Sequence, residues 1–231
     1  APMKAQFSAI ADHALLVTFA KELSDAAHAH VFALDMALVT NVPVGVIETV
    51  PALVNLLVSF DPMATDHLTV QKHVGACLEE LKLQEIAGGR RSVQVCYEPP
   101  FAPDLDAVAS ATGLSREAVI NAHLEGDYRA LMYGFAPGYA YLAGVPNQIQ
   151  VPRKTTPVRD VPAGSVIIAG PQCLVTTLTM PTGWSNIGRS PTPIFTGDPE
   201  HPFLFDVGDN VTFERIDCTT YQLLSQGGNN V

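Results

Sequence analysis

The sequence has little basic charge and no long apolar run, and these two shortages exclude several classes of protein. Its 231 residues contain 13 lysines and arginines against 23 aspartates and glutamates, a formal net charge of −10. Nucleic-acid-binding proteins instead carry a basic face. No stretch is apolar enough to cross a bilayer, and the N-terminal residues lack the apolar core of a signal peptide. We therefore expect a cytoplasmic protein with no nucleic-acid or membrane partner.

Cysteine is also scarce, and the usual signatures of metal or nucleophile chemistry are missing. The four cysteines are far apart in the sequence and form no C-x-x-C pair, which predicts separate, mostly buried thiols: Cys77, Cys96, Cys173 and Cys218. The seven histidines do not fall at metal-ligand spacing with carboxylates, so we expect no metal site. Phosphate-loop, zinc-protease and serine-hydrolase motifs are absent. Any nucleotide must then be bound by other loops or shared with a partner.

The first 97 residues alternate between strand-like and helix-like patterns. Apolar and β-branched runs predict strands at 14–19, 44–50, 55–60 and 91–97. Ser24 can cap a helix that runs to about residue 39, and Thr65 or Asp66 can cap another that runs to about residue 83. The order β-α-β-β-α-β predicts a ferredoxin-like α+β domain over residues 1–97.

The remaining chain changes character and predicts a second domain over residues 98–220. Two short leading helices are expected at 104–111 and 115–123, the second with Ser115 at its start. Short strands separated by turn residues follow at 129–133, 165–169, 174–178, 193–195 and 210–215. This spacing is typical of a β-barrel. Residues 221–231 are predicted to form a flexible tail, with the polar segment 225–230 loose.

Residues 134–189 combine glycine and proline at a density that no regular helix tolerates. Two arginines, a glutamine and the single tryptophan occur within or beside the same rigid segments. The combination predicts a pocket with a rigid, polar rim on the barrel. Its candidate binding residues are Phe135, Pro137, Gly138, Gln172, Trp184 and Arg189, and Arg153 is a candidate catalytic residue that could also bind a ligand.

Each candidate has a functional and a structural interpretation. Arg153 and Arg189 suit carboxylate or phosphate recognition, or are ordinary surface charges. Gln172 would orient a carbonyl substrate or complete a turn, and Trp184 would be a core ring or a pocket wall. Phe135, Pro137 and Gly138 would bring backbone close to a ligand or form a tight barrel corner.

His123 closes the second short helix and is the candidate general acid or base. A histidine titrates near neutrality with little tuning, so at the barrel mouth it could transfer a proton. The alternative is a histidine placed at a helix C-terminus because the helix dipole favours a cation there.

The motifs of the second half resemble those of one known family. They are Gly134-Phe135-Ala136-Pro137-Gly138-Tyr139, Pro152-Arg153, Val161-Pro162-Ala163-Gly164-Ser165-Val166, Ala169-Gly170 with Gln172, and Gly183-Trp184 through Gly188-Arg189. This order resembles the family of allophanate hydrolase subunit 1, the B subunit of 5-oxoprolinase (PxpB) and the histidine-kinase inhibitor KipI. The resemblance runs from about residue 7 to 216. The sequence departs from the family pattern at Glu98-Pro99-Pro100, where many members carry a glycine pair.

The resemblance implies a cyclophilin-like C-terminal barrel behind a ferredoxin-like domain. It also implies a heteromeric complex with a second cyclophilin-like subunit, of the biotin-dependent carboxylase-associated type, and a third subunit. In 5-oxoprolinase such a complex uses ATP, with magnesium, to open 5-oxo-L-proline to L-glutamate. Arg153 and Arg189 would then hold phosphate or the substrate carboxylate, and His123 would move a proton.

The resemblance leaves three functions open. The first is a subunit of an ATP-dependent lactam or amide hydrolase, inactive alone and most simply a 5-oxoprolinase. The second is an allophanate-hydrolase-type subunit in urea breakdown. The third is a KipI-like inhibitor that binds a sensor histidine kinase.

Overall fold

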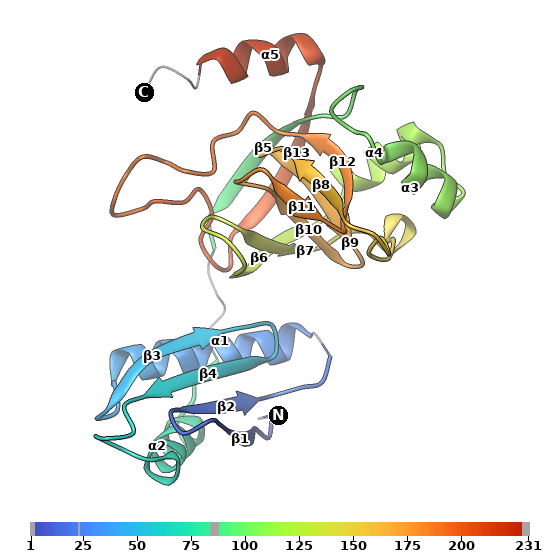
Figure 1. Cartoon of the computed structure of the whole chain (residues 1–231). Coiled ribbons are helices and arrows are strands. Elements are labelled where there is room, and N and C mark those ends of the chain that lie inside the picture. Colours follow the sequence, from blue (N-terminus) through green and yellow to red (C-terminus); the bar gives the residue numbers. More distant parts are fainter. Residues whose placement is uncertain (1–2, 23, 84–87, 228–231) are drawn as a thin grey trace. The chain divides into compact units, whose positions relative to one another are not determined.

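The computed structural model describes residues 3–22, 24–83 and 88–227. These form two compact units, Ala1–Ile86 and Ala87–Val231, each with its own apolar core (Figure 1). Within the described residues, no helix combines the length and the apolar character that crossing a membrane requires.

The first unit is a four-stranded antiparallel sheet covered by two helices. Its strands, in sheet order, are β1 (Gln6–Ile10), β2 (Ala14–Thr18), β4 (Asn55–Phe60) and β3 (Val46–Pro51). The helices are α1 (Asp25–Thr40) and α2 (His67–Glu79), whose first turns are capped by the side chains of Ser24 and Asp66, as predicted. Alternate strand residues such as Val17 and Val58 point to the helices and are fully buried.

The predicted strand at 91–97 forms, but not in this sheet. As β5 (Arg90–Cys96) it pairs in parallel with β13 (Asn210–Ile216) over its whole length and belongs to the second unit. The fourth strand of the first sheet is instead β1, which pairs with β2 in a hairpin. The order is therefore β-β-α-β-β-α with antiparallel pairing throughout, which corrects the expected ferredoxin-like arrangement and the boundary at residue 97.

The second unit is a closed seven-stranded barrel, as its turn-rich sequence predicted. Its remaining strands are β6 (Tyr128–Tyr133), β7 (Ala140–Ala143), β9 (Ser165–Ala169), β10 (Gln172–Val175) and β12 (Ser185–Arg189). They close in the order β10-β7-β6-β13-β5-β12-β9. The pair β5–β13 is parallel and the other neighbours are antiparallel.

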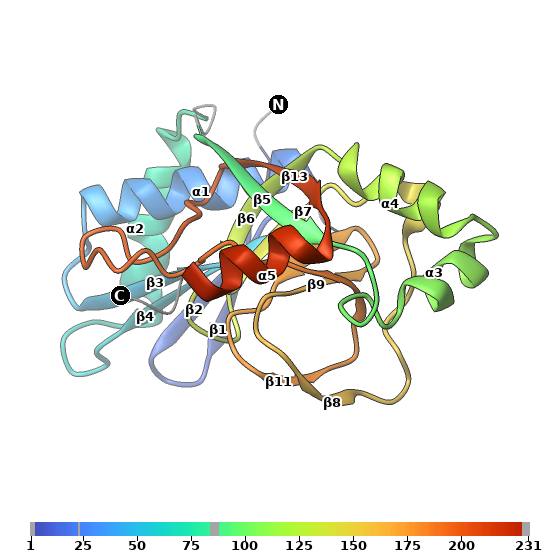
Figure 2. The same ribbon diagram turned by 90° about the horizontal axis from the view of Figure 1, so that it is seen from above.

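Several smaller elements surround the barrel. Helices α3 (Leu105–Thr112) and α4 (Arg116–Leu124) lie side by side on one flank with the short helix η1 (Asn147–Ile149) (Figures 1 and 2). Strands β8 (Val158–Val161) and β11 (Met180–Thr182) form a separate two-stranded ribbon. Residues 193–195 form no strand, and Phe195 makes only an isolated bridge to Phe203.

The end of the chain also differs from the expectation. Residues 218–227 form helix α5 (Cys218–Gly227), which directly follows β13, so most of the predicted flexible tail is helical (Figure 1). Asp217 accepts a hydrogen bond from the Thr220 amide at 2.7 Å and thereby caps the helix. The rest of the predicted tail, residues 228–231, lies outside the described residues.

Candidate functional site

The alternation of side chains along β9, β10 and β7 divides the barrel residues into two sets. Ile168, Cys173 and Leu142 lie opposite one another and point into the barrel core. The alternate residues, Ile167 and Leu174, belong to a separate small apolar cluster. Because successive strand residues point to opposite faces, this second cluster lies on the outer face of the barrel. The candidate pocket is built on it.

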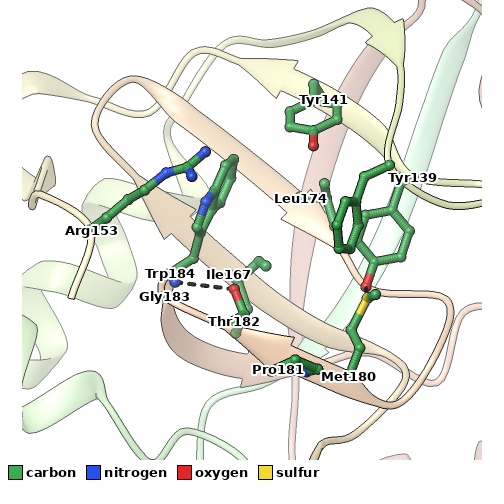
Figure 3. Close-up of a pocket in the computed structure, with 11 residues that line it drawn as sticks. Tyr139, Tyr141, Arg153, Ile167, Leu174, Met180, Pro181, Thr182, Gly183 and Trp184 are labelled. Atoms are coloured by element: carbon green, nitrogen blue, oxygen red, sulfur yellow. Dashed lines mark hydrogen bonds between the residues drawn. The ribbon is translucent and has the colours of Figure 1, made fainter. Parts of the chain in front are cut away.

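The pocket has a volume of about 150 Å³ and is formed by the outer face of the barrel, strand β11 and the loops that carry Phe135, Arg153 and Trp184 (Figure 3). Its walls are mainly aromatic and aliphatic, with one cationic side chain. It is lined by Phe135, Tyr139, Tyr141, Arg153, Ile167, Leu174, Met180, Pro181, Thr182, Gly183 and Trp184. Three of the predicted binding residues, Phe135, Arg153 and Trp184, therefore meet in one place.

Arg153 and Trp184 form the polar end of the pocket. The guanidinium carbon of Arg153 lies 5.5 Å from the centroid of the indole ring, within cation–π range. Figure 3 shows the guanidinium extended over the ring. Trp184 also packs edge-on against Tyr141 at 5.9 Å between ring centroids. The arginine thus has one face against the indole, and its donors remain able to bind an anionic group.

A partly buried polar anchor holds the loop that carries Arg153. The next residue, Lys154, donates from Nζ to Oδ2 of Asp104 at 2.5 Å, and the same oxygen accepts from the Asn186 amide at 2.6 Å. The Lys154 amide donates to the Gly183 carbonyl at 2.7 Å. Arg153 and Trp184 therefore sit on two segments that are tied directly to each other.

The opposite end of the pocket is formed by tyrosines and a methionine. The Tyr139 hydroxyl contacts the Met180 sulfur (Figure 3). Burial, reinforced by Tyr141, raises the pKa of Tyr139 to about 12, so its hydroxyl stays protonated at neutral pH. Phe135 is 75% exposed with a positive φ of 71°, and its ring contacts that of Tyr139 in a tilted arrangement with 5.7 Å between centroids. It covers the rim of the pocket.

Pro137 and Gly138 shape this rim without lining the pocket. The Pro137 carbonyl accepts a hydrogen bond from Thr177 at 2.7 Å. Gly138 has φ of 75°, and a Cβ there would come within 2.9 Å of the Thr177 side chain. These contacts favour the tight-corner alternative for the Pro-Gly pair.

His123 does not face the barrel mouth, and this expectation was wrong. Its side chain is fully buried in the barrel core, with Nδ1 2.7 Å from the Tyr97 hydroxyl and Nε2 3.5 Å from Cys173 Sγ. Burial lowers the pKa of His123 to about 3, so the ring is neutral at physiological pH. Cys173 points inward whereas its neighbour Leu174 lines the pocket, so the strand separates His123 from that site.

Arg189 and Gln172 also lie outside the group that lines the pocket. Arg189 ends β12 and its guanidinium carbon lies 5.7 Å from the Phe101 ring centroid. Gln172 begins β10 opposite Ala143 and Ala169. The structure therefore separates the two arginines that were expected to act on one ligand.

Three residues of the pocket that were not predicted from the sequence as site residues are Tyr139, Tyr141 and Met180. The Thr182 hydroxyl accepts a hydrogen bond from the Trp184 amide at 3.1 Å, which leaves its own proton free to donate. The alternation of Phe135, Tyr139 and Tyr141 with small residues was the available signal for the aromatic wall.

Comparison with known proteins shows which family the chain belongs to. The family model described as carboxyltransferase domain, subdomain C and D, matches residues 5–205. The chain belongs to this family. It is 35% identical over 236 residues to the B subunit of 5-oxoprolinase from Bacillus subtilis, covering 97% of this chain and 98% of that protein. The protein of the same name from Escherichia coli O157:H7 is 34% identical, covering 73% of this chain and 77% of the relative.

Solved structures share the fold. The crystal structure of TTHA0988 matches with a TM-score of 0.77 at 32% identity, covering 89% of this chain, which spans only 40% of that longer protein. PH0987 from Pyrococcus horikoshii matches over its full length at 34% identity and a TM-score of 0.55, covering 94% of this chain. Urea amidolyase of K. lactis has a TM-score of 0.83 at 16% identity, with 97% of this chain and 16% of the enzyme covered. At that identity the likeness concerns the fold alone.

Proposed function

We propose that this chain is a subunit of an ATP-dependent 5-oxoprolinase, which opens the ring of 5-oxo-L-proline to give L-glutamate. The observation that carries the proposal is the end-to-end match to the B subunit of a 5-oxoprolinase, over 97% of this chain and 98% of the relative. A match of this extent supports the same role in a complex of several subunits.

The chemistry of the pocket supports a small, flat, anionic amide as the ligand. 5-Oxo-L-proline has a five-membered lactam ring and one carboxylate. The planar guanidinium of Arg153 is suited to bind that carboxylate in a bidentate manner. The rings of Trp184 and Tyr141 offer apolar surfaces for the lactam, and the Thr182 hydroxyl can donate to its carbonyl oxygen.

The same pocket does not fit ATP with its magnesium ion. Its volume of about 150 Å³ is below the roughly 300–1,000 Å³ of pockets that enclose drug-sized ligands. Among the described residues that line it, Arg153 is the single cation and none is Asp, Glu or His. The proposal therefore assigns this pocket to the lactam, and assigns the nucleotide to surfaces completed by partner subunits.

The expected partners are a second cyclophilin-like subunit of the biotin-dependent carboxylase-associated type and a third subunit. An unstrained lactam resists attack by water, so activation by ATP is chemically reasonable for this reaction. In this assignment His123 takes no direct part, because a neutral histidine sealed in the core cannot reach the lactam.

The test is co-expression of this chain with the candidate partner subunits, followed by an assay of ATP-dependent glutamate release from 5-oxo-L-proline. We expect release from the full complex and none when this chain or ATP is omitted. Equal release without this chain, or none from a stable complete complex, would contradict the proposal. In the latter case the same preparation can be tested on other amides.

A further inference from the structure

Two cysteines that are 122 residues apart in the sequence meet at the start of α5. Strand pairing explains their proximity, because Ile216 of β13 lies directly opposite Cys96 of β5, and Cys218 begins the helix two residues later. The two Sγ atoms are 3.7 Å apart. This is much longer than a disulfide bond of about 2.05 Å, so both thiols are free.

Glu98 completes a cluster of three potential ligands. It follows Cys96 by two residues, so it shares a side of the extended chain with it. Val95 and Tyr97, before and between them, point instead into the barrel core. One ligand atom from each of Cys96, Glu98 and Cys218 lies within 4.8 Å of the others. Cys96 is buried whereas the other two are partly exposed, so the cluster is accessible from one side.

The spacing of the sulfurs matches the edge of a tetrahedral metal site. Two thiolates bound to zinc at about 2.3 Å in tetrahedral geometry are about 3.8 Å apart. The 3.7 Å separation of the two sulfurs is therefore within about 0.1 Å of the ligand spacing of a tetrahedral zinc site. Two thiolates and one carboxylate also favour zinc and similar cations over magnesium or calcium, which prefer oxygen ligands alone.

We propose that Cys96, Glu98 and Cys218 form a binding site for a thiophilic divalent cation, with zinc as the preferred ion. Three protein ligands leave the fourth tetrahedral position to water. None of the three residues lines the pocket assigned to the lactam, so this site is separate from that pocket. The bound ion would join α5 to β5 and fix the C-terminal helix on the barrel.

In the metal-free chain the Cys218 thiol is protonated. Interaction with the neighbouring Glu98 carboxylate, together with burial and Cys96, raises the pKa of the Cys218 thiol to about 12, and this thiol donates to the Pro99 carbonyl at 3.8 Å. Binding of zinc would release the thiol protons to solvent, as for other cysteine sites. The expectation of no metal site considered residues close in sequence, and this cluster is assembled by strand pairing.

Cobalt(II) is the probe that tests this site in the full chain. The chain is freed of metal with a chelator, kept reduced with a phosphine, and titrated with cobalt under absorption spectroscopy. We expect one cobalt ion per chain, with the thiolate-to-cobalt charge-transfer band and the visible bands of tetrahedral coordination, and displacement by zinc. Cys218→Ser should abolish the charge-transfer signal, and Glu98→Gln should weaken binding by roughly tenfold. Cys77 is a partly exposed free thiol of the other unit. The Cys77→Ser variant should therefore bind cobalt as the unchanged chain does.

Two results would overturn the site. One is the absence of cobalt uptake by the folded, reduced chain, checked by circular dichroism and by counting free thiols. The other is an unchanged signal in both Cys218→Ser and Glu98→Gln. Neither result would bear on the proposed lactam pocket, because that pocket is formed by other residues and is tested separately by the glutamate-release assay.

Discussion

Lys154 and Asp104 are joined by an ion pair of 2.5 Å that lies mostly out of solvent, with side-chain exposures of 24% and 19%. The pair fixes the loop next to Arg153, and the same Asp104 oxygen receives the Asn186 amide. A residue before α3 therefore positions two segments that are distant in sequence, and it does so without touching the pocket itself.

We expect Asp104→Ala to lower the free energy of unfolding by about 2 kcal/mol, since it removes two charge-assisted hydrogen bonds. Chemical denaturation of the variant measures this loss. Asp106→Ala is the matched control, because Asp106 is 74% exposed and pairs with Arg116 at the surface. Surface pairs contribute less than about 1 kcal/mol. Equal losses in the two variants would contradict the role of Asp104 as an anchor.

Trp184 is the single tryptophan of the chain, so its fluorescence reports directly on the pocket. We expect 5-oxo-L-proline to change this emission, and 2-pyrrolidinone, the same ring without the carboxylate, to bind roughly tenfold or more weakly. In Arg153→Ala the preference between the two ligands should disappear. A preference that survives this substitution would show that the carboxylate is bound elsewhere.

Burial of His123 predicts a pH dependence of stability whose sign follows from proton uptake. Its pKa is about 3 in the folded chain against an ordinary 6.5. Between these values the unfolded chain binds a proton that the folded chain does not, so stability falls as pH falls through this window. The steepest contribution of one such proton is about 1.4 kcal/mol per pH unit.

Unfolding of His123→Gln at a series of pH values between 7 and 4 tests this contribution. The variant should lose less stability on acidification than the unchanged chain. His201→Gln, which replaces an exposed histidine, should retain the original slope. Identical pH dependences of the unfolding free energy in all three chains would contradict the prediction, because they would mean that His123 takes up a proton at the same pH in the folded and unfolded chains.

Local patterns were sufficient to predict most elements. Capping residues such as Ser24 and Asp66, followed by apolar residues at helical spacing, marked the helix starts correctly. The barrel was also predicted, from short strands and frequent turns. Helix α5 was missed because residues 225–230 are polar and glycine-rich, which outweighed the Asp217 cap.

Two features could not be predicted from the sequence: which distant strands pair, and whether a given side chain points into the core or toward the surface. The partner of β5 is β13, about 120 residues later, and nothing local distinguishes this from pairing in the first sheet. The sequence shows that His123 lies at a helix end, but it does not show that the side chain points into the core. The expected position at the barrel mouth was therefore wrong. Arg153 and Trp184 were found because their loops are rigid, while Tyr139 and Met180 meet only in the folded chain.

The corrected boundary gives a prediction about fragments. Residues 87–231 contain every strand of the barrel, whereas residues 98–231 lack β5, so β12 and β13 each lose one of their two neighbours and the barrel is opened. We expect the longer fragment to unfold cooperatively and the shorter one to remain unfolded or aggregate, since an open edge invites association. Thermal unfolding followed by circular dichroism compares them. A cooperative transition in the shorter fragment would contradict the assignment of β5.

The most direct test of the lactam pocket is glutamate release by the reconstituted complex containing Arg153→Ala. Loss of a charge-assisted contact of about 1.5–3 kcal/mol corresponds to a rise in KM for 5-oxo-L-proline of roughly 10- to 150-fold. Arg159→Ala, an exposed arginine on β8 that lies outside the pocket, is the charge-matched control and should leave KM unchanged. An increase confined to Arg153→Ala is the result we predict. Equal KM values for the two variants and the unchanged chain would contradict the assignment of the lactam to this pocket.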